Sequence, residues 1–219
     1  MDQTMKTIQQ KLDEGRQYRR FDVSGLELRS DENEAERTVS GYATTFNQPY
    51  ELWSYDGYTV LEQIDARAFD ECDSSDVIMQ YDHEGRVFAR TSNGTLHLNA
   101  DDTGLHIRAD LGGTELGRQL YEEIKGGYTN KMSFGFRVGE DKREVTEDHE
   151  NNKVTVLRTI TKISKLYDVS AVSLPANDAT SISARNFGEG VVAEIKQELL
   201  AREARERQKK KIKILTEVI

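Results

Sequence analysis

The chain has 219 residues, with Lys+Arg 30 against Asp+Glu 39 and a formal net charge of -9. This length fits one globular domain with extensions, and the acidity argues against a protein whose whole surface binds nucleic acid. Cys72 is the single cysteine, which excludes an intramolecular disulfide and a cysteine-based zinc cage. No stretch resembles a signal peptide or a membrane span, so we expect a soluble protein with no membrane partner.

The first part of the chain divides into an extension and a β-rich body. Residues 1–20 are polar with sparse apolar positions, which predicts an arm that is helical only when docked. From Phe21 onward, short apolar runs alternate with charged turns, and this pattern predicts strands. We therefore expect a β domain over residues 21–187.

Two short segments inside this body carry specific expectations. Residues 65–69 are expected to form a short helix capped by Asp65. The mostly apolar run 76–81 has the length of a strand, and it leads directly into Asp82-His83-Glu84. His83 is therefore expected at the end of a buried strand.

Residues 95–110 form the clearest hairpin signal, with a turn at 101–104 and alternation on both sides. Setting Ala100 opposite Leu105 predicts that one face holds Leu96, Leu98, Leu105, Ile107 and Ala109, and the other His97, Asn99, His106 and Arg108. Two histidines on a sheet surface could bind a metal, but no third ligand stands at a definite spacing. We therefore expect no metal and no other cofactor.

A helix followed by a strand comes next. Residues 114–125 carry an apolar helical stripe, a Thr114 cap and a stop at Gly126-Gly127. In the strand that follows, alternation places Met132, Phe134, Phe136 and Val138 on one face. Ser133 lies on the opposite face beside Gly135, where it is either an ordinary solvent-facing serine or a nucleophile on a rigid strand.

The last third of the chain contains a polar segment, further strands and a charged tail. Residues 139–153 are acidic and predict a long mobile loop or a wide hairpin tip. Two strands are expected in 154–174, with a break near Ser164-Lys165. Residues 188–219 predict a charged helical tail, which is either solvated or a docking or oligomerisation element.

The residue types available for chemistry favour a serine mechanism. The chain has 4 histidines, no glycine-rich phosphate loop and no His-Glu-x-x-His zinc helix. Among the histidines, His83 stands between two acids at a strand end, a position suited to a general base. Attack by Ser133 assisted by His83 is the simplest chemistry that these residues offer.

The order of several motifs along the chain resembles that of the tailed-phage prohead maturation protease family. The motifs are Asp82-His83-Glu84 with Gly85-Arg86, residues 102–105, Gly126-Gly127, Met132-Ser133-Phe134-Gly135-Phe136, and the segment 166–176 that ends in Leu174-Pro175-Ala176. The resemblance covers roughly residues 26–185 and leaves both termini outside it.

The resemblance implies a fold and a set of site residues. It implies an α+β, mainly β fold, built as a closed antiparallel β-barrel of the herpesvirus assemblin type with surrounding helices and helical terminal extensions. His83 and Ser133 match the catalytic pair of the family. Asp168 appears at a position where many members carry glutamate, and it would orient the imidazole.

Other residues remain candidates for parts of this site. Asp82 and Glu84 are alternatives to Asp168 as the third member of the site. Backbone N–H groups together with Arg158, in the strand before Asp168, are the candidates for stabilising the oxyanion.

The resulting hypothesis is a serine endopeptidase that acts in the host cytoplasm, inside the immature prohead. Its expected substrates are scaffold or the scaffolding segment of the major capsid protein, together with its own chain. The resemblance leaves pairing of two copies open. A catalytically inactive, scaffold-binding assembly factor is the alternative, and a nucleic-acid-binding protein that uses the basic tail is disfavoured by the overall acidity.

Overall fold

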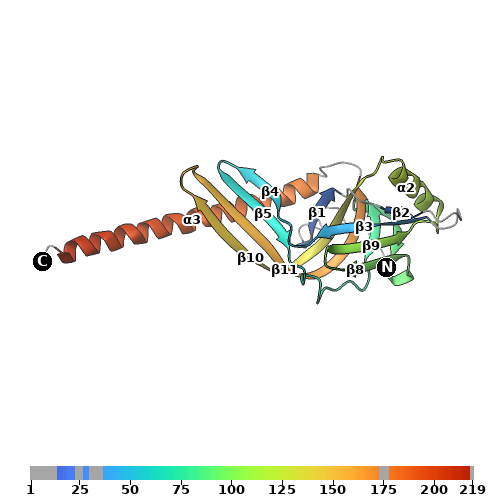
Figure 1. Cartoon of the computed structure of the whole chain (residues 1–219), viewed down its shortest axis with the longest axis horizontal. Coiled ribbons are helices and arrows are strands. Elements are labelled where there is room, and N and C mark those ends of the chain that lie inside the picture. Colours follow the sequence, from blue (N-terminus) through green and yellow to red (C-terminus); the bar gives the residue numbers. More distant parts are fainter. Residues whose placement is uncertain (1–13, 23–26, 30–36, 173–177, 218–219) are drawn as a thin grey trace.

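A computed structural model describes residues 14–22, 27–29, 37–172 and 178–217. Within these ranges the fold is mainly β, with two α-helices, α2 (Glu115–Lys125) and α3 (Asp178–Glu217), and a short 3-10 helix, η1 (Thr91–Asn93) (Figure 1). The helical arm expected over residues 1–20 lies outside the described residues as far as residue 13. Its described end is not helical, because residues 17–20 belong to the strand β1 (Gln17–Asp22). No helix in these ranges is long and apolar enough to cross a membrane.

The strands form two antiparallel or mixed sheets. The larger sheet has the order β1-β10-β11-β5-β4, with β6 paired to β11 and β7 paired to β6, and the smaller has the order β2-β3-β9-β8. The strands are β1 (Gln17–Asp22), β2 (Glu27–Arg29), β3 (Thr38–Thr45), β4 (Tyr50–Tyr55), β5 (Tyr58–Ile64), β6 (Ile78–Tyr81), β7 (Glu84–Arg90), β8 (Leu96–Ala100), β9 (Gly104–Asp110), β10 (Lys131–Asp148) and β11 (Lys153–Val172).

The predicted closed barrel is wrong, although the mainly β character is confirmed. Among the described residues neither sheet closes on itself, because β1 and β4 end the main run of the larger sheet and β2 and β8 end the smaller. Alternation within a strand identifies its buried face but does not fix which strands meet at the ends of a sheet. Closure was an expectation from the resemblance alone.

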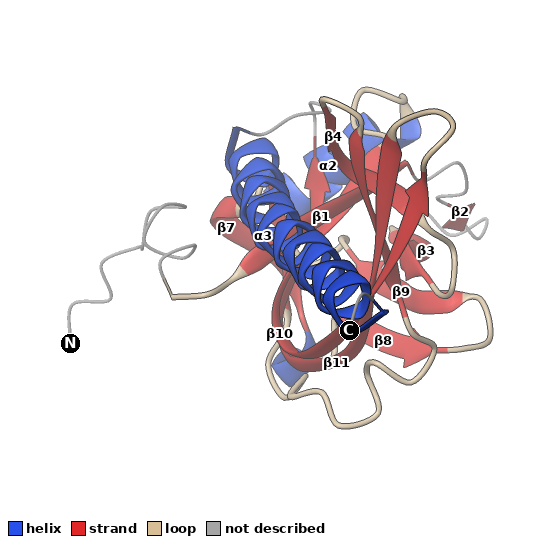
Figure 2. Cartoon of the chain, turned by 90° about the vertical axis from the view of Figure 1, so that its left-hand side faces the viewer, coloured by secondary structure: helices blue, strands red, loops and turns tan. Residues whose placement is uncertain are grey.

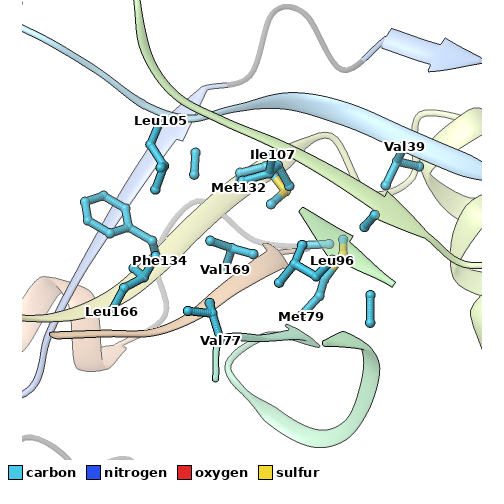
Figure 3. Close-up of a cluster of buried hydrophobic side chains, with 14 of the residues drawn as sticks. Val39, Val77, Met79, Leu96, Leu105, Ile107, Met132, Phe134, Leu166 and Val169 are labelled. Atoms are coloured by element: carbon cyan, nitrogen blue, oxygen red, sulfur yellow. The ribbon is translucent and has the colours of Figure 1, made fainter. Parts of the chain in front are cut away.

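The core lies between the two sheets. Figure 3 shows Val39 and Ile107 from the smaller sheet facing Met79, Phe134 and Val169 from the larger one. All five side chains are fully buried. Each such side chain stabilises the fold by roughly 1.5–3 kcal/mol relative to exposure, so this layer fixes the strands that carry the site.

The sequence predicts the local elements with short-range signals correctly. In the β8–β9 hairpin Ala100 pairs with Leu105, as expected, and Leu96, Ile107 and Ala109 are buried. Helix α2 begins after Thr114, whose side chain accepts a hydrogen bond from the backbone N–H of Gly117 at 3.0 Å. Both the hairpin register and the helix cap are confirmed.

Three further local predictions are wrong, at least in part. Residues 66–71 form a series of turns and no helix, and the Asp65 carboxylate accepts a hydrogen bond from the backbone N–H of Arg67 at 2.9 Å in the first of these turns. Residues 139–153 form no mobile loop. They do form the end of a hairpin, as the alternative expected, but its tip is narrow: β10 continues to Asp148 and pairs with β11 up to the turn at residues 149–152. The backbone hydrogen bonds of this segment come from pairing with the neighbouring strand, which the polar sequence does not predict.

The third correction concerns β11, which is continuous where two strands were expected. It nevertheless changes partner in that region: Val154–Ile160 pairs in parallel with β5, and Asp168–Ala171 pairs in parallel with β6. The expected break near Ser164-Lys165 therefore falls between the two parallel partners of a single long strand.

Helix α3 packs its first half on the far end of the larger sheet. Val191, Val192 and Ile195 form a second buried cluster with Val60 and Val156. Beyond this cluster the helix continues past the strand ends, and residues 201–212 are exposed (Figures 1 and 2). The helical tail predicted from residue 188 thus belongs to a longer helix that begins at Asp178.

Candidate active site

Ser133 lies on β10 between two other strands. It is paired with Arg20 of β1 on one side and with Ser170 of β11 on the other. The apolar neighbours Met132 and Phe134 point into the core, as alternation predicts. Ser133 itself is only 1 % exposed, because β1 pairs beside it and the imidazole of His83 lies against its hydroxyl.

His83 lies in the turn that joins β6 to β7. Asp82 and His83 have φ angles of 48° and 62°, and Tyr81 pairs with Glu84 across the turn. Two central residues with positive φ define a type I′ hairpin turn, whose twist matches that of the flanking strands. A left-handed backbone is uncommon outside glycine, but aspartate and histidine adopt it more readily than most residues, so this pair suits the turn.

Asp168 comes from β11, next to the strand that carries Ser133. It pairs with Gly135 and is 0 % exposed. The hydroxyl of Ser170, two residues further along the strand, donates a hydrogen bond of 2.8 Å to its Oδ1. Ser133 and Asp168 are thus placed by two strands that share one ladder.

These three side chains meet in series. Nε2 of His83 is 2.6 Å from Oγ of Ser133, and Nδ1 of His83 is hydrogen-bonded to Oδ1 of Asp168. His83 is 2 % exposed, so the whole series is shielded from solvent. The structure therefore brings together the three residues that the sequence singled out.

The surroundings favour a charged carboxylate at Asp168. Burial by itself raises the pKa of Asp168, but the charge and hydrogen bond of His83 outweigh burial, and the pKa is lowered. Nη1 of Arg16 lies 3.6 Å from Oδ2 and adds to this effect. An ionised carboxylate at this position accepts the Nδ1–H of the imidazole and leaves Nε2 free to take a proton.

Gly135 makes room for this arrangement. A Cβ atom at this position would collide with Oδ2 of Asp168 and would lie 2.8 Å from Cε1 of Tyr18. The ring of Tyr18 in turn lies 4.4 Å from the imidazole of His83, centroid to centroid. The absent side chain beside Ser133 therefore admits the carboxylate and the aromatic ring that enclose the imidazole.

The other predicted site residues are Arg158, Asp82 and Glu84, and none of them is part of the hydrogen-bonded series. Arg158 is buried and donates hydrogen bonds to Asp141 and, at 2.7 Å, to Glu62, so its predicted oxyanion role stays a prediction. Asp82 shares the turn with His83, and Glu84 begins β7. Among the described residues no group of three or more His, Cys, Asp or Glu side chains could hold a metal ion.

Sequence reasoning missed two charged residues near the serine. Arg19 falls within the predicted N-terminal extension and Glu62 has no predicted role, yet both are buried and joined by an ion pair. No local pattern marks either residue, because the pair forms between positions 43 residues apart in the chain.

A hydroxyl, an imidazole and a carboxylate hydrogen-bonded in series are the arrangement of serine hydrolases. The family model described as caudovirus prohead serine protease matches residues 24–192, which is well over half of the chain. The chain therefore belongs to the caudovirus prohead serine protease family, and the predicted family membership is confirmed.

One solved structure is similar, and the similarity is weak. It is described as the bacteriophage T4 capsid assembly protease, gp21, and it shares 11 % sequence identity with a TM-score of 0.39. The alignment covers 72 % of this chain and 98 % of that one. No curated protein sequence matches the chain.

Proposed function

We propose that this prohead protease is an endopeptidase in which Ser133 is the nucleophile, His83 the general base and Asp168 the carboxylate that orients the imidazole. The observation that carries the proposal is the 2.6 Å contact between Nε2 of His83 and Oγ of Ser133. A general base must lie within hydrogen-bond reach of the proton it removes, and these two atoms do.

The residues assign each proton in the reaction. Oγ of Ser133 attacks the carbonyl carbon of the scissile peptide while Nε2 of His83 takes the hydroxyl proton. The same proton then passes to the leaving amine as the peptide C–N bond breaks, which leaves an ester on Ser133. Water, deprotonated by His83, hydrolyses the ester and regenerates the hydroxyl.

The proposed substrates are scaffold, or the scaffolding segment of the major capsid protein, together with the chain itself. We place the reaction inside the immature prohead in the host cell. Confinement with the substrates provides a high effective concentration, so strong binding to each substrate is not required. The exposed residues 201–212 of α3 offer a surface for recruitment to the assembling shell.

Replacing the nucleophile tests this function. Ser133→Ala should fold normally, and should neither process co-expressed capsid and scaffold proteins nor react with a fluorophosphonate probe. Ser54→Ala is the matched control, because Ser54 is an exposed strand serine, and it should behave like the wild type. Mass spectrometry of the products provides the readout. New termini produced by purified Ser133→Ala protein would exclude Ser133 from the mechanism.

A further inference from the structure

The strand β1 lies against Ser133 in the manner of a bound peptide. β1 is an edge strand that pairs antiparallel with β10, and Arg20 stands opposite Ser133. Oγ of Ser133 lies 3.0 Å from the backbone carbonyl oxygen of Arg19, within hydrogen-bond reach. Addition of a strand to a sheet edge is a common way to bind extended peptides. The chain thus presents one of its own carbonyl groups to the proposed nucleophile.

The side chain of that same residue enters a buried acidic pocket. The guanidinium of Arg19 binds both carboxylate oxygens of Glu62, through Nε and, at 3.0 Å, through Nη2. Arg19 is 2 % exposed and Glu62 is 0 % exposed. Such a two-point contact between guanidinium and carboxylate combines charge with planar geometry and selects arginine over other side chains.

Other groups hold Glu62 in place at the floor of this pocket. Its carboxylate also accepts hydrogen bonds from Oη of Tyr50 at 2.6 Å and from Nη1 of Arg158 at 2.7 Å. Burial by itself raises the pKa of Glu62, but Arg19 and Arg158 outweigh burial and lower the pKa to about 2. The carboxylate is therefore charged at neutral pH.

The charges around Glu62 balance only when one further cation is bound there. Arg158 is shared between Glu62 and Asp141, so two carboxylates face one fixed guanidinium, and Arg19 supplies the second positive charge. A buried carboxylate that loses its partner is strongly destabilised. A peptide that displaces β1 restores the balance only if it brings a cation to the same place.

We propose that Glu62 selects substrates with arginine at the residue whose carbonyl meets Ser133, and that β1 is the first such occupant, presenting the bond between Arg19 and Arg20. This inference rests on the proposed function. It names a substrate class, which is peptides with an arginine on the amino side of the cleaved bond.

Cleavage of β1 would follow the same balanced steps. Oγ of Ser133 bonds to the carbonyl carbon of Arg19, and the bond from this carbon to the nitrogen of Arg20 breaks. The proton of the hydroxyl passes through His83 to the new amine of Arg20. Water, deprotonated by His83, then hydrolyses the ester and releases the carboxylate of Arg19, so that the edge of β10 beside Ser133 can pair with another substrate.

The first experiment measures the selectivity of the full-length protein on peptides. The probe peptide contains the β1 sequence, residues 17–22, and its variants carry Gln, Lys or Glu in place of the first arginine. We expect kcat/KM for the arginine peptide to exceed that for the glutamine peptide by roughly 10²-fold, because the buried carboxylate is unpaired when glutamine is bound. Equal rates for the arginine and glutamine peptides would overturn the inference.

The second experiment uses the chain's own terminus and two matched variants. In the wild type, mass spectrometry should find a new N-terminus at Arg20, and Arg19→Gln should abolish it. Arg20→Gln should still be cut after Arg19. A cut that follows residue 20, or one that persists in Arg19→Gln, contradicts the proposal.

A third variant assigns the selectivity to Glu62 itself. Glu62→Gln should bring the rates for the arginine and glutamine peptides close to each other. If this variant fails to fold, the wild-type peptide series decides the matter. Fluorophosphonate labelling of Ser133 separates the arginine selectivity from the serine mechanism. If the enzyme is labelled but shows no preference for arginine, only the role of Glu62 in selectivity is disproved. If the wild type is neither labelled nor active, the proposed function is disproved as well.

Discussion

Adding one methyl group at Gly135 tests how closely the Asp168 carboxylate and the Tyr18 ring pack around the proposed site. An alanine Cβ would collide with the Asp168 carboxylate and with Tyr18. We expect Gly135→Ala to lower stability by roughly 1–3 kcal/mol, the usual range for overpacking, and to lower peptide cleavage further by displacing the carboxylate. Chemical denaturation and peptide cleavage provide the measurements.

A second glycine on the same strand is the control. At Gly139 a Cβ would meet only the flexible side chain and backbone oxygen of Lys162, at 3.1 Å or more. Gly139→Ala should therefore stay close to the wild type in activity. Equal losses for both variants would show that β10 tolerates no added methyl group and that the contact with Asp168 is not special.

Asp168 offers a direct test of the carboxylate. Asp168→Asn keeps the size of the side chain but removes the charge that holds the imidazole in the tautomer with Nε2 unprotonated. We expect kcat to fall by about three to four orders of magnitude, as for the corresponding change in serine proteases, while the fold is kept. Asp70→Asn, at an exposed position, is the control. Full activity of Asp168→Asn would remove this residue from the mechanism.

At the scale of elements, the sequence predicts what neighbouring residues decide. The β8–β9 register follows from alternation on both sides of a short turn, and α2 follows from its cap and apolar stripe. The second half of β10 has no such signal, because its stability comes from pairing with β11. A polar segment that is a strand only because it pairs with the next strand is therefore mistaken for a loop.

The cap of α2 provides a prediction at the same scale. Thr114→Ala removes the acceptor for the N–H of Gly117, and we expect the free energy of unfolding to fall by about 1 kcal/mol. Thr114→Ser keeps the hydroxyl and should retain most of the stability. Urea denaturation of the three proteins measures the difference. If alanine and serine are equally stable, the side chain does not cap the helix.

Over the whole molecule, the sequence identifies the reactive side chains but not what surrounds them. His83, Ser133 and Asp168 belong to recognisable local motifs, and the fold brings them together. The pairing of β1 with β10 and the ion pair of Arg19 with Glu62 both join segments that lie far apart in the chain. Whether a sheet closes into a barrel also depends on which distant strands pair, and in the described residues neither sheet closes.

Acidification should destabilise the whole molecule through Glu62. Its pKa lies at about 2 in the folded protein against the ordinary 4.5. Because folding lowers this pKa, Glu62 stabilises the fold fully at pH values above its ordinary pKa of 4.5. This stabilisation is lost as the pH falls from about 4.5 through about 2. The difference corresponds to roughly 3 kcal/mol.

Unfolding free energies measured across this pH range check the expectation. Glu62→Gln should be less stable at neutral pH, because Arg19 loses its partner, and should show a flatter dependence on acid. Glu51→Gln, at an exposed strand position, should follow the wild type. Parallel curves for wild type and Glu62→Gln would mean that other carboxylates govern the acid response.

One strand aligns all three members of the proposed site. Strand β11 carries the carboxylate, pairs with the segment of β10 that carries the hydroxyl, and pairs in parallel with β6, the strand that leads to the imidazole. The backbone N–H of Asp82, next to His83, also donates a hydrogen bond of 3.0 Å to the carbonyl oxygen of Ala171 in this strand. A distortion of β11 would therefore misalign the whole proton relay at once.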